Sequence, residues 1–153
     1  MYQKFILNLT FIFIITHSTV IKAEVDQSHI ETEYRKFKKT FQSILELSIQ
    51  NKQGFLEQFS KLYSDLINQQ KAFEKLEGET LTPQGNQMAF DIEALRPLQT
   101  LADNKANVDS CQEANRMQSL NIANPDSEAN ESPSPVSKID DFINKAIKSI
   151  CSK

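Results

Sequence analysis

The chain has 153 residues, a formal net charge of −3, three glycines, two cysteines and no tryptophan. Its length suits one domain, and its negative charge gives no electrostatic reason to bind phosphate backbones, so nucleic-acid binding is disfavoured. So few glycines also disfavour phosphate-binding loops and hairpin turns, which need positive φ or close backbone approach. Frequent Gln, Lys, Glu, Leu and Ala are helix formers, and they predict an all-α fold: a small helical bundle or hairpin-like domain with long amphipathic helices.

Residues 1–23 have the pattern of a secretory signal peptide. Lys4 precedes the largely apolar run 5–15, and polar residues then lead to the small residue Ala23, the order that export and cleavage require. The run reaches only about halfway across ~30 Å of hydrocarbon, so it is a poor membrane anchor. Cleavage after Ala23 is expected; a cut after Ser18 or Thr19, or an uncleaved signal-anchor helix, are the alternatives. The mature protein is expected to be secreted and extracellular.

Residues 24–120 form the predicted helical domain, which opens with two apolar stripes at helical spacing. One stripe runs from Ile30 to Ile49 and the other from Phe55 to Leu76, with steps of three and four residues. Gly54 separates them and leaves two interpretations. It could end one helix before an antiparallel partner, or it could lie within one helix of about fifty residues, ~75 Å long. No proline and no cluster of turn residues marks a break there, so the continuous or kinked helix is slightly favoured.

Later breaks have clearer markers. Gly78 predicts the end of the second stripe, and Thr82 followed by Pro83 is typical of a helix start, although Gly85 could move that start nearer Asn86. Pro97 lacks an amide donor and clashes with the preceding turn, so a kink or a fresh helix start is expected there. Residues 103–107 are predicted to form a loop.

Residues 121–137 are predicted to be a flexible linker, and residues 138–153 an amphipathic helix docked on the domain. The linker holds three prolines and many small polar residues, which leave little apolar area to offset the entropy of ordering. Asn130 begins a glycosylation acceptor pattern, although Pro133 directly after it lowers the chance of use. Ser137 is the expected helix cap, with Asp140 three residues on. One apolar face follows it: Ile139, Phe142, Ile143, Ala146, Ile147, Ile150 and Cys151.

The two cysteines, Cys111 and Cys151, are expected to form one intramolecular disulfide. In an exported chain this is the simplest use of an isolated pair. The bond would hold the C-terminal helix against the domain despite the linker. Two free thiols, or a bridge between two chains, are the alternatives.

No catalytic, metal-binding or cofactor-binding pattern is found. After removal of the signal peptide His29 is the one remaining histidine, and its place near the terminus favours an exposed polar residue over a catalytic base. The carboxylate pairs at 31 and 33 and at 140 and 141 do not share a helix face. Zinc and calcium spacings are absent. A non-enzyme without metal or cofactor is therefore expected.

Three functional hypotheses remain. The main one is binding of an extracellular protein partner through an amphipathic or acidic helical surface, since residues 77–131 hold ten acidic and three basic side chains; self-association through the same helices is a further option. The second is a carrier for a small apolar ligand. The third is a membrane-active or antimicrobial factor acting through 137–153. Five phenylalanines could line the carrier's cavity, although such residues are more often plain core: Phe37, Phe41, Phe55, Phe59 and Phe73.

Overall fold

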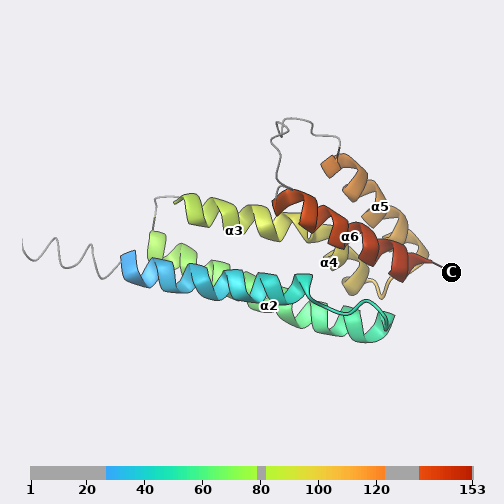
Figure 1. The fold of residues 1–153 in the computed structure, drawn as a ribbon, viewed down its shortest axis with the longest axis horizontal. Helices are drawn as coiled ribbons and strands as arrows, with labels where there is room; N and C mark the ends of the chain where they lie inside the picture. Colours follow the sequence, from blue (N-terminus) through green and yellow to red (C-terminus); the bar gives the residue numbers. More distant parts are fainter. Residues whose placement is uncertain (1–26, 79–81, 123–134, 153) are drawn as a thin grey trace, which may run out of the picture.

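In a computed structural model the chain is built from helices, and the all-α prediction is confirmed. The structure describes residues 27–78, 82–122 and 135–152, and within these ranges it contains no strand. A first helix spans residues 27–45. Five more follow it (Figure 1): α2 (Lys52–Glu77), α3 (Pro83–Ala94), α4 (Arg96–Asp103), α5 (Val108–Ile122) and α6 (Pro135–Cys151). No helix in the described ranges is long and apolar enough to cross a membrane.

The first two helices form an antiparallel hairpin, so the favoured continuous helix through Gly54 is wrong (Figure 1). The break falls earlier, at residues 46–51, and Gly54 lies in the first turn of α2. Its backbone N–H donates to the Asn51 side chain at 3.1 Å, so Asn51 supplies the N-cap that starts the second helix. The hairpin buries both apolar stripes together: the rings of Tyr34 and Phe73 have centroids 6.5 Å apart.

The end of α2 and the start of α3 follow the local sequence closely. Gly78 has a φ of +68° and its N–H donates to the Glu74 carbonyl at 3.1 Å, which is a conformation that glycine adopts without strain. Helix α3 begins at Pro83, as the Thr82–Pro83 pair indicates, and not at the alternative start nearer Asn86; Thr82 is its cap. The Thr82 hydroxyl accepts the Gly85 N–H at 3.1 Å, and the Glu77 carboxylate accepts the Thr82 N–H at 2.8 Å.

Pro97 separates α3 from α4, as expected from its missing amide donor. Helix α3 ends at Ala94 and α4 begins at Arg96, which places Pro97 in the first turn of α4. Backbone N–H groups in a first turn make no hydrogen bond within the helix, so the missing N–H of proline costs nothing there. The expected loop near residues 103–107 is also present as a turn at 104–106. There Ala106 takes a φ of +49° and donates its N–H to the Leu101 carbonyl at 2.7 Å.

Helix α6 packs its apolar face into the body of the protein. Ile143, Ile147 and Ile150 are buried, and the Phe142 and Phe55 ring centroids lie 6.2 Å apart. The helix begins at Pro135, so the prediction that Ser137 caps it is wrong: Ser137 lies inside the helix. The middle of the predicted linker lies outside the described residues, as do the predicted signal peptide and Asn130.

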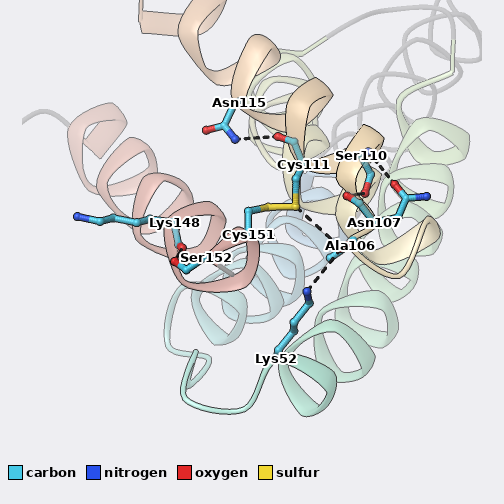
Figure 2. The surroundings of a disulfide bond; sticks show 9 residues. All are labelled: Lys52, Ala106, Asn107, Ser110, Cys111, Asn115, Lys148, Cys151 and Ser152. Atoms are coloured by element: carbon cyan, nitrogen blue, oxygen red, sulfur yellow. Dashed lines mark hydrogen bonds between the residues drawn. A yellow bond between two sulfur atoms is a disulfide. The ribbon is translucent and has the colours of Figure 1, made fainter.

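Cys111 and Cys151 form the predicted disulfide, with sulfur atoms 2.07 Å apart (Figure 2). The bond joins α5 to the last turn of α6. Beside it the ammonium of Lys52, from α2, donates to the Ala106 carbonyl at 3.5 Å. The disulfide thus lies where α2, α5, α6 and the turn before α5 converge.

The buried apolar residues form one cluster drawn from every helix. Its members are Phe37, Phe41, Ile44, Phe55, Leu56, Phe59, Leu66, Phe73, Met88, Ile92, Leu95, Leu98, Leu101, Ala106, Ala114, Ile139, Ile143, Ala146, Ile147 and Ile150. One continuous core of this kind supports a single folded unit.

Candidate ligand-binding groove

A groove of about 310 Å³ lies between the first helix, α3 and the beginning of α6. This volume is at the lower end of the range of ~300–1,000 Å³ that small-molecule sites occupy. The first helix contributes five residues to its lining, α3 three and α6 two: Tyr34, Lys38, Phe41, Gln42 and Leu45; Gln87, Phe90 and Asp91; Lys138 and Ile139. The groove thus depends on the docking of α6 beside the first helix and α3.

Asp91 is the most unusual of these residues, because only 2% of it is exposed. One carboxylate oxygen, Oδ1, accepts a hydrogen bond from the Gln87 side chain at 2.7 Å. The other, Oδ2, makes no hydrogen bond with any described residue. The ammonium of Lys38 is 3.9 Å from Oδ2, which is an ion pair but too long for a hydrogen bond.

Burial raises the pKa of the Asp91 carboxyl, because desolvation penalises its charged form. The hydrogen bond from Gln87 and the charge of Lys38 each lower the pKa and offset only part of this effect. The groove therefore contains an incompletely satisfied carboxylate. An additional hydrogen-bond donor placed at Oδ2 would stabilise its charged form.

Aromatic rings form much of the apolar wall. Phe41 is buried, whereas 54% of Phe90 is exposed. The Lys38 ammonium lies 6.0 Å from the centre of the Phe41 ring, about the limit at which a cation and an aromatic face attract each other. Burial raises the pKa of the Tyr34 hydroxyl, with smaller contributions from Asp91 and Glu31. The wall therefore combines apolar contact with one position where a cation already sits.

Most of the phenylalanines expected to line a cavity lie elsewhere. Phe37, Phe55, Phe59 and Phe73 are buried in the core, and of the five only Phe41 lines the groove. These four side chains pack against neighbours in the hydrophobic core and do not line the groove. The interpretation of these phenylalanines as plain core is therefore confirmed for four of the five, and the alternative of a cavity lining made by all five is wrong.

Sequence reasoning missed Asp91, although the sequence contained an indication. Asp91 lies three residues after Met88 and four before Leu95, so it occupies the apolar stripe of α3. A carboxylate on that stripe must be buried with a partner or open onto a cavity. His29, by contrast, is exposed on the first helix as expected.

The lining of the groove is suited to binding. Its charged, amide and apolar side chains offer ion pairing, hydrogen bonding and apolar contact. Among the residues that the structure describes, no group of three or more histidine, cysteine, aspartate or glutamate side chains could hold a metal ion. Comparisons of the chain with protein-family models, curated proteins and solved structures find no match in any of the three.

Proposed function

We propose that this protein is a secreted, non-enzymatic carrier that holds one small, largely apolar ligand in the groove between the first helix, α3 and α6. The observation that carries the proposal is the groove itself, which combines aromatic walls with the buried, incompletely paired carboxylate of Asp91. Sites for small molecules are mostly apolar clefts with a few placed polar groups. Secretion is supported by the pattern of residues 1–23 and by the disulfide, which is typical of exported proteins.

A protein partner has less support among the described residues. The exposed large apolar side chains are spread over three helices: Leu76 on α2, Phe90 on α3, and Val108 and Leu120 on α5. Single exposed apolar residues are normal on soluble proteins, whereas a docking surface requires a contiguous patch. Of these four, Phe90 alone also lines the groove. We therefore place ligand binding ahead of partner binding.

Membrane activity through the C-terminal helix would require α6 to leave the body of the protein. Its apolar residues Ile143, Ile147 and Ile150 are buried, and Cys151 ties its last turn to α5. An interfacial helix needs that apolar face free to enter the lipid. The carrier hypothesis requires no such rearrangement.

The test uses the oxidised, secreted protein and the uncharged fluorophore N-phenyl-1-naphthylamine, whose emission rises in apolar sites. The native protein should bind it saturably with one site per chain. Gln42→Trp places a large ring in the groove and should weaken binding at least about tenfold, since overfilling a site costs ~1–3 kcal/mol. The probe is excited where tryptophan does not absorb.

Gln53→Trp is the matched control. Both glutamines are exposed and donate to a glutamate four residues on, Gln42 to Glu46 at 2.8 Å and Gln53 to Glu57 at 2.7 Å. Only Gln42 lines the groove, so the control should bind the probe as the native protein does. Absence of saturable binding by the native protein, or equal binding by the Gln42→Trp variant, would overturn the proposal.

A further inference from the structure

The buried carboxylate of Asp91 requires a hydrogen-bond donor that the described part of the protein does not supply. Gln87 donates to Oδ1, whereas Oδ2 is buried and makes no hydrogen bond with any described residue, in a side chain that lines the groove. A buried polar atom left unpaired is costly, and a buried charge more so. A ligand that donates a hydrogen bond to Oδ2 and carries a positive charge would both satisfy this atom and balance the buried negative charge.

Lys38 marks the position that such a charge would take. Its ammonium lies near the two groups of the groove that attract cations, 3.9 Å from Asp91 Oδ2 and 6.0 Å from the centre of the Phe41 ring. Half of the Lys38 side chain is exposed, and its flexible stem lets the ammonium turn outward to water. A ligand ammonium could therefore replace it at closer range to Oδ2 without moving the backbone.

From this geometry we infer that the ligand is a protonated primary amine with an apolar body, an alkylammonium or arylalkylammonium. Its ammonium donates to Asp91 and its apolar body lies against Phe41, Phe90 and Ile139. The inference rests on the proposed carrier function and specifies its ligand class. Tyr34 adds a third aromatic residue to the same wall.

An anionic ligand fits this groove less well. Lys38 and Lys138 would attract it, but both ammonium groups are exposed and already hydrated. Neither lysine therefore needs an anion to satisfy its charge. The same anion would approach Asp91, whose position is fixed by burial and by Gln87. Like charges at that range repel.

The experiment compares three phenyl-bearing probes of similar size for their ability to displace N-phenyl-1-naphthylamine from the native protein: phenethylamine, 2-phenylethanol and 3-phenylpropionate. Phenethylamine should displace the fluorophore at a concentration at least about tenfold lower than either of the other probes. The reason is that a hydrogen bond between an ammonium and a carboxylate is stronger than one between neutral groups. Asp91→Asn, which keeps the shape of the side chain, should abolish the preference for the amine.

Lys38→Met provides the sharper test, because it removes the internal competitor for Asp91. It should tighten phenethylamine binding about threefold or more, as expected when a competing charge is removed. An anion site would instead lose affinity with this variant. Lys39→Met, at an exposed lysine of the same helix that does not line the groove, should change nothing. If Asp91→Asn fails to fold, the Lys38→Met and Lys39→Met variants still test whether the groove prefers an amine.

The outcomes separate this inference from the proposed function. If 3-phenylpropionate or 2-phenylethanol binds as tightly as the amine, or if Lys38→Met weakens amine binding, the ligand class is wrong while the carrier function stands. Saturable binding of the fluorophore without displacement by any of the three probes also overturns the ligand class alone. If the fluorophore itself does not bind, the carrier function fails first.

Discussion

Replacing both Cys111 and Cys151 with serine should destabilise the folded protein without abolishing it. The bond joins residues 40 apart in sequence, so its loss restores to the unfolded chain the freedom of a loop of that size. The loop-closure entropy for this length is worth about 4 kcal/mol at 25 °C. Because domains of this kind have stabilities of ~5–15 kcal/mol, the variant should remain folded, with a melting temperature lower by about 15 °C.

The native contacts around the bond should largely survive its removal. Helix α6 also docks through the buried residues Ile143, Ile147 and Ile150, and the Ser149 hydroxyl donates to the Ile49 carbonyl at 3.4 Å. The helical circular-dichroism signal of the variant should therefore match that of the native protein before denaturant is added. The cost should be seen in the free energy of unfolding instead.

Urea unfolding followed by circular dichroism measures this cost. Native protein held in reductant provides the control, since it lacks the same bond without any substitution and should unfold at the same urea concentration as the double variant. The reasoning would be refuted by a loss of less than about 1 kcal/mol, well below the range of ~2–5 kcal/mol usual for native disulfides. An early loss of helical signal would show instead that α6 depends on the bond for docking.

Three further predictions concern the core, a turn and the groove. Phe59→Ala should cost about 3–5 kcal/mol in urea unfolding because Phe59 is fully buried, whereas Phe90→Ala, at a half-exposed residue, should cost less than about 1 kcal/mol; similar costs would contradict the core assignment. Gly78→Ala should lower stability by about 1–3 kcal/mol in thermal unfolding, since φ is +68° there, and an unchanged melting temperature would refute this strain. Burial raises the pKa of the Asp91 carboxyl above its usual 3.8, so the folded protein binds the carboxyl proton more tightly than the unfolded chain does. The folded protein therefore loses stability as the pH rises from about 4 and this proton is released. Asp91→Asn does not titrate, so its stability relative to the native protein should increase between about pH 4 and pH 7; a relative decrease would mean that the ion pair with Lys38 outweighs burial.

Local features predicted several boundaries correctly. Gly78, Thr82 with Pro83, and Pro97 each act on their own backbone, through a positive φ, a capping hydroxyl or a missing amide donor. Such effects operate over a few residues, so they can be read without knowing what packs nearby. The helical class followed for the same reason, from residue propensity and apolar periodicity.

The break between the first two helices was missed because its cause is not local. Asn51 can cap a helix, but Leu56 follows Ile49 by seven residues, so the apolar stripe keeps its helical register across the break. The choice between one long helix and a hairpin is made by burial, since an isolated long helix would leave its apolar stripe in water. Pairing of Tyr34 with Phe73 across the hairpin relieves that exposure.

Residue types and their order along the chain were enough to predict the helical class, the clearest helix ends and the one possible pairing of Cys111 with Cys151, and to recognise the signal-peptide pattern. These depend on residue type and spacing along the chain. The position of the groove, and the presence of Asp91 in its lining, could be found only from the packing of the helices. The groove exists because the first helix, α3 and α6 meet there; the burial of Asp91, and the distance from Lys38 that leaves Oδ2 unpaired, arise only when residues far apart in sequence are packed together.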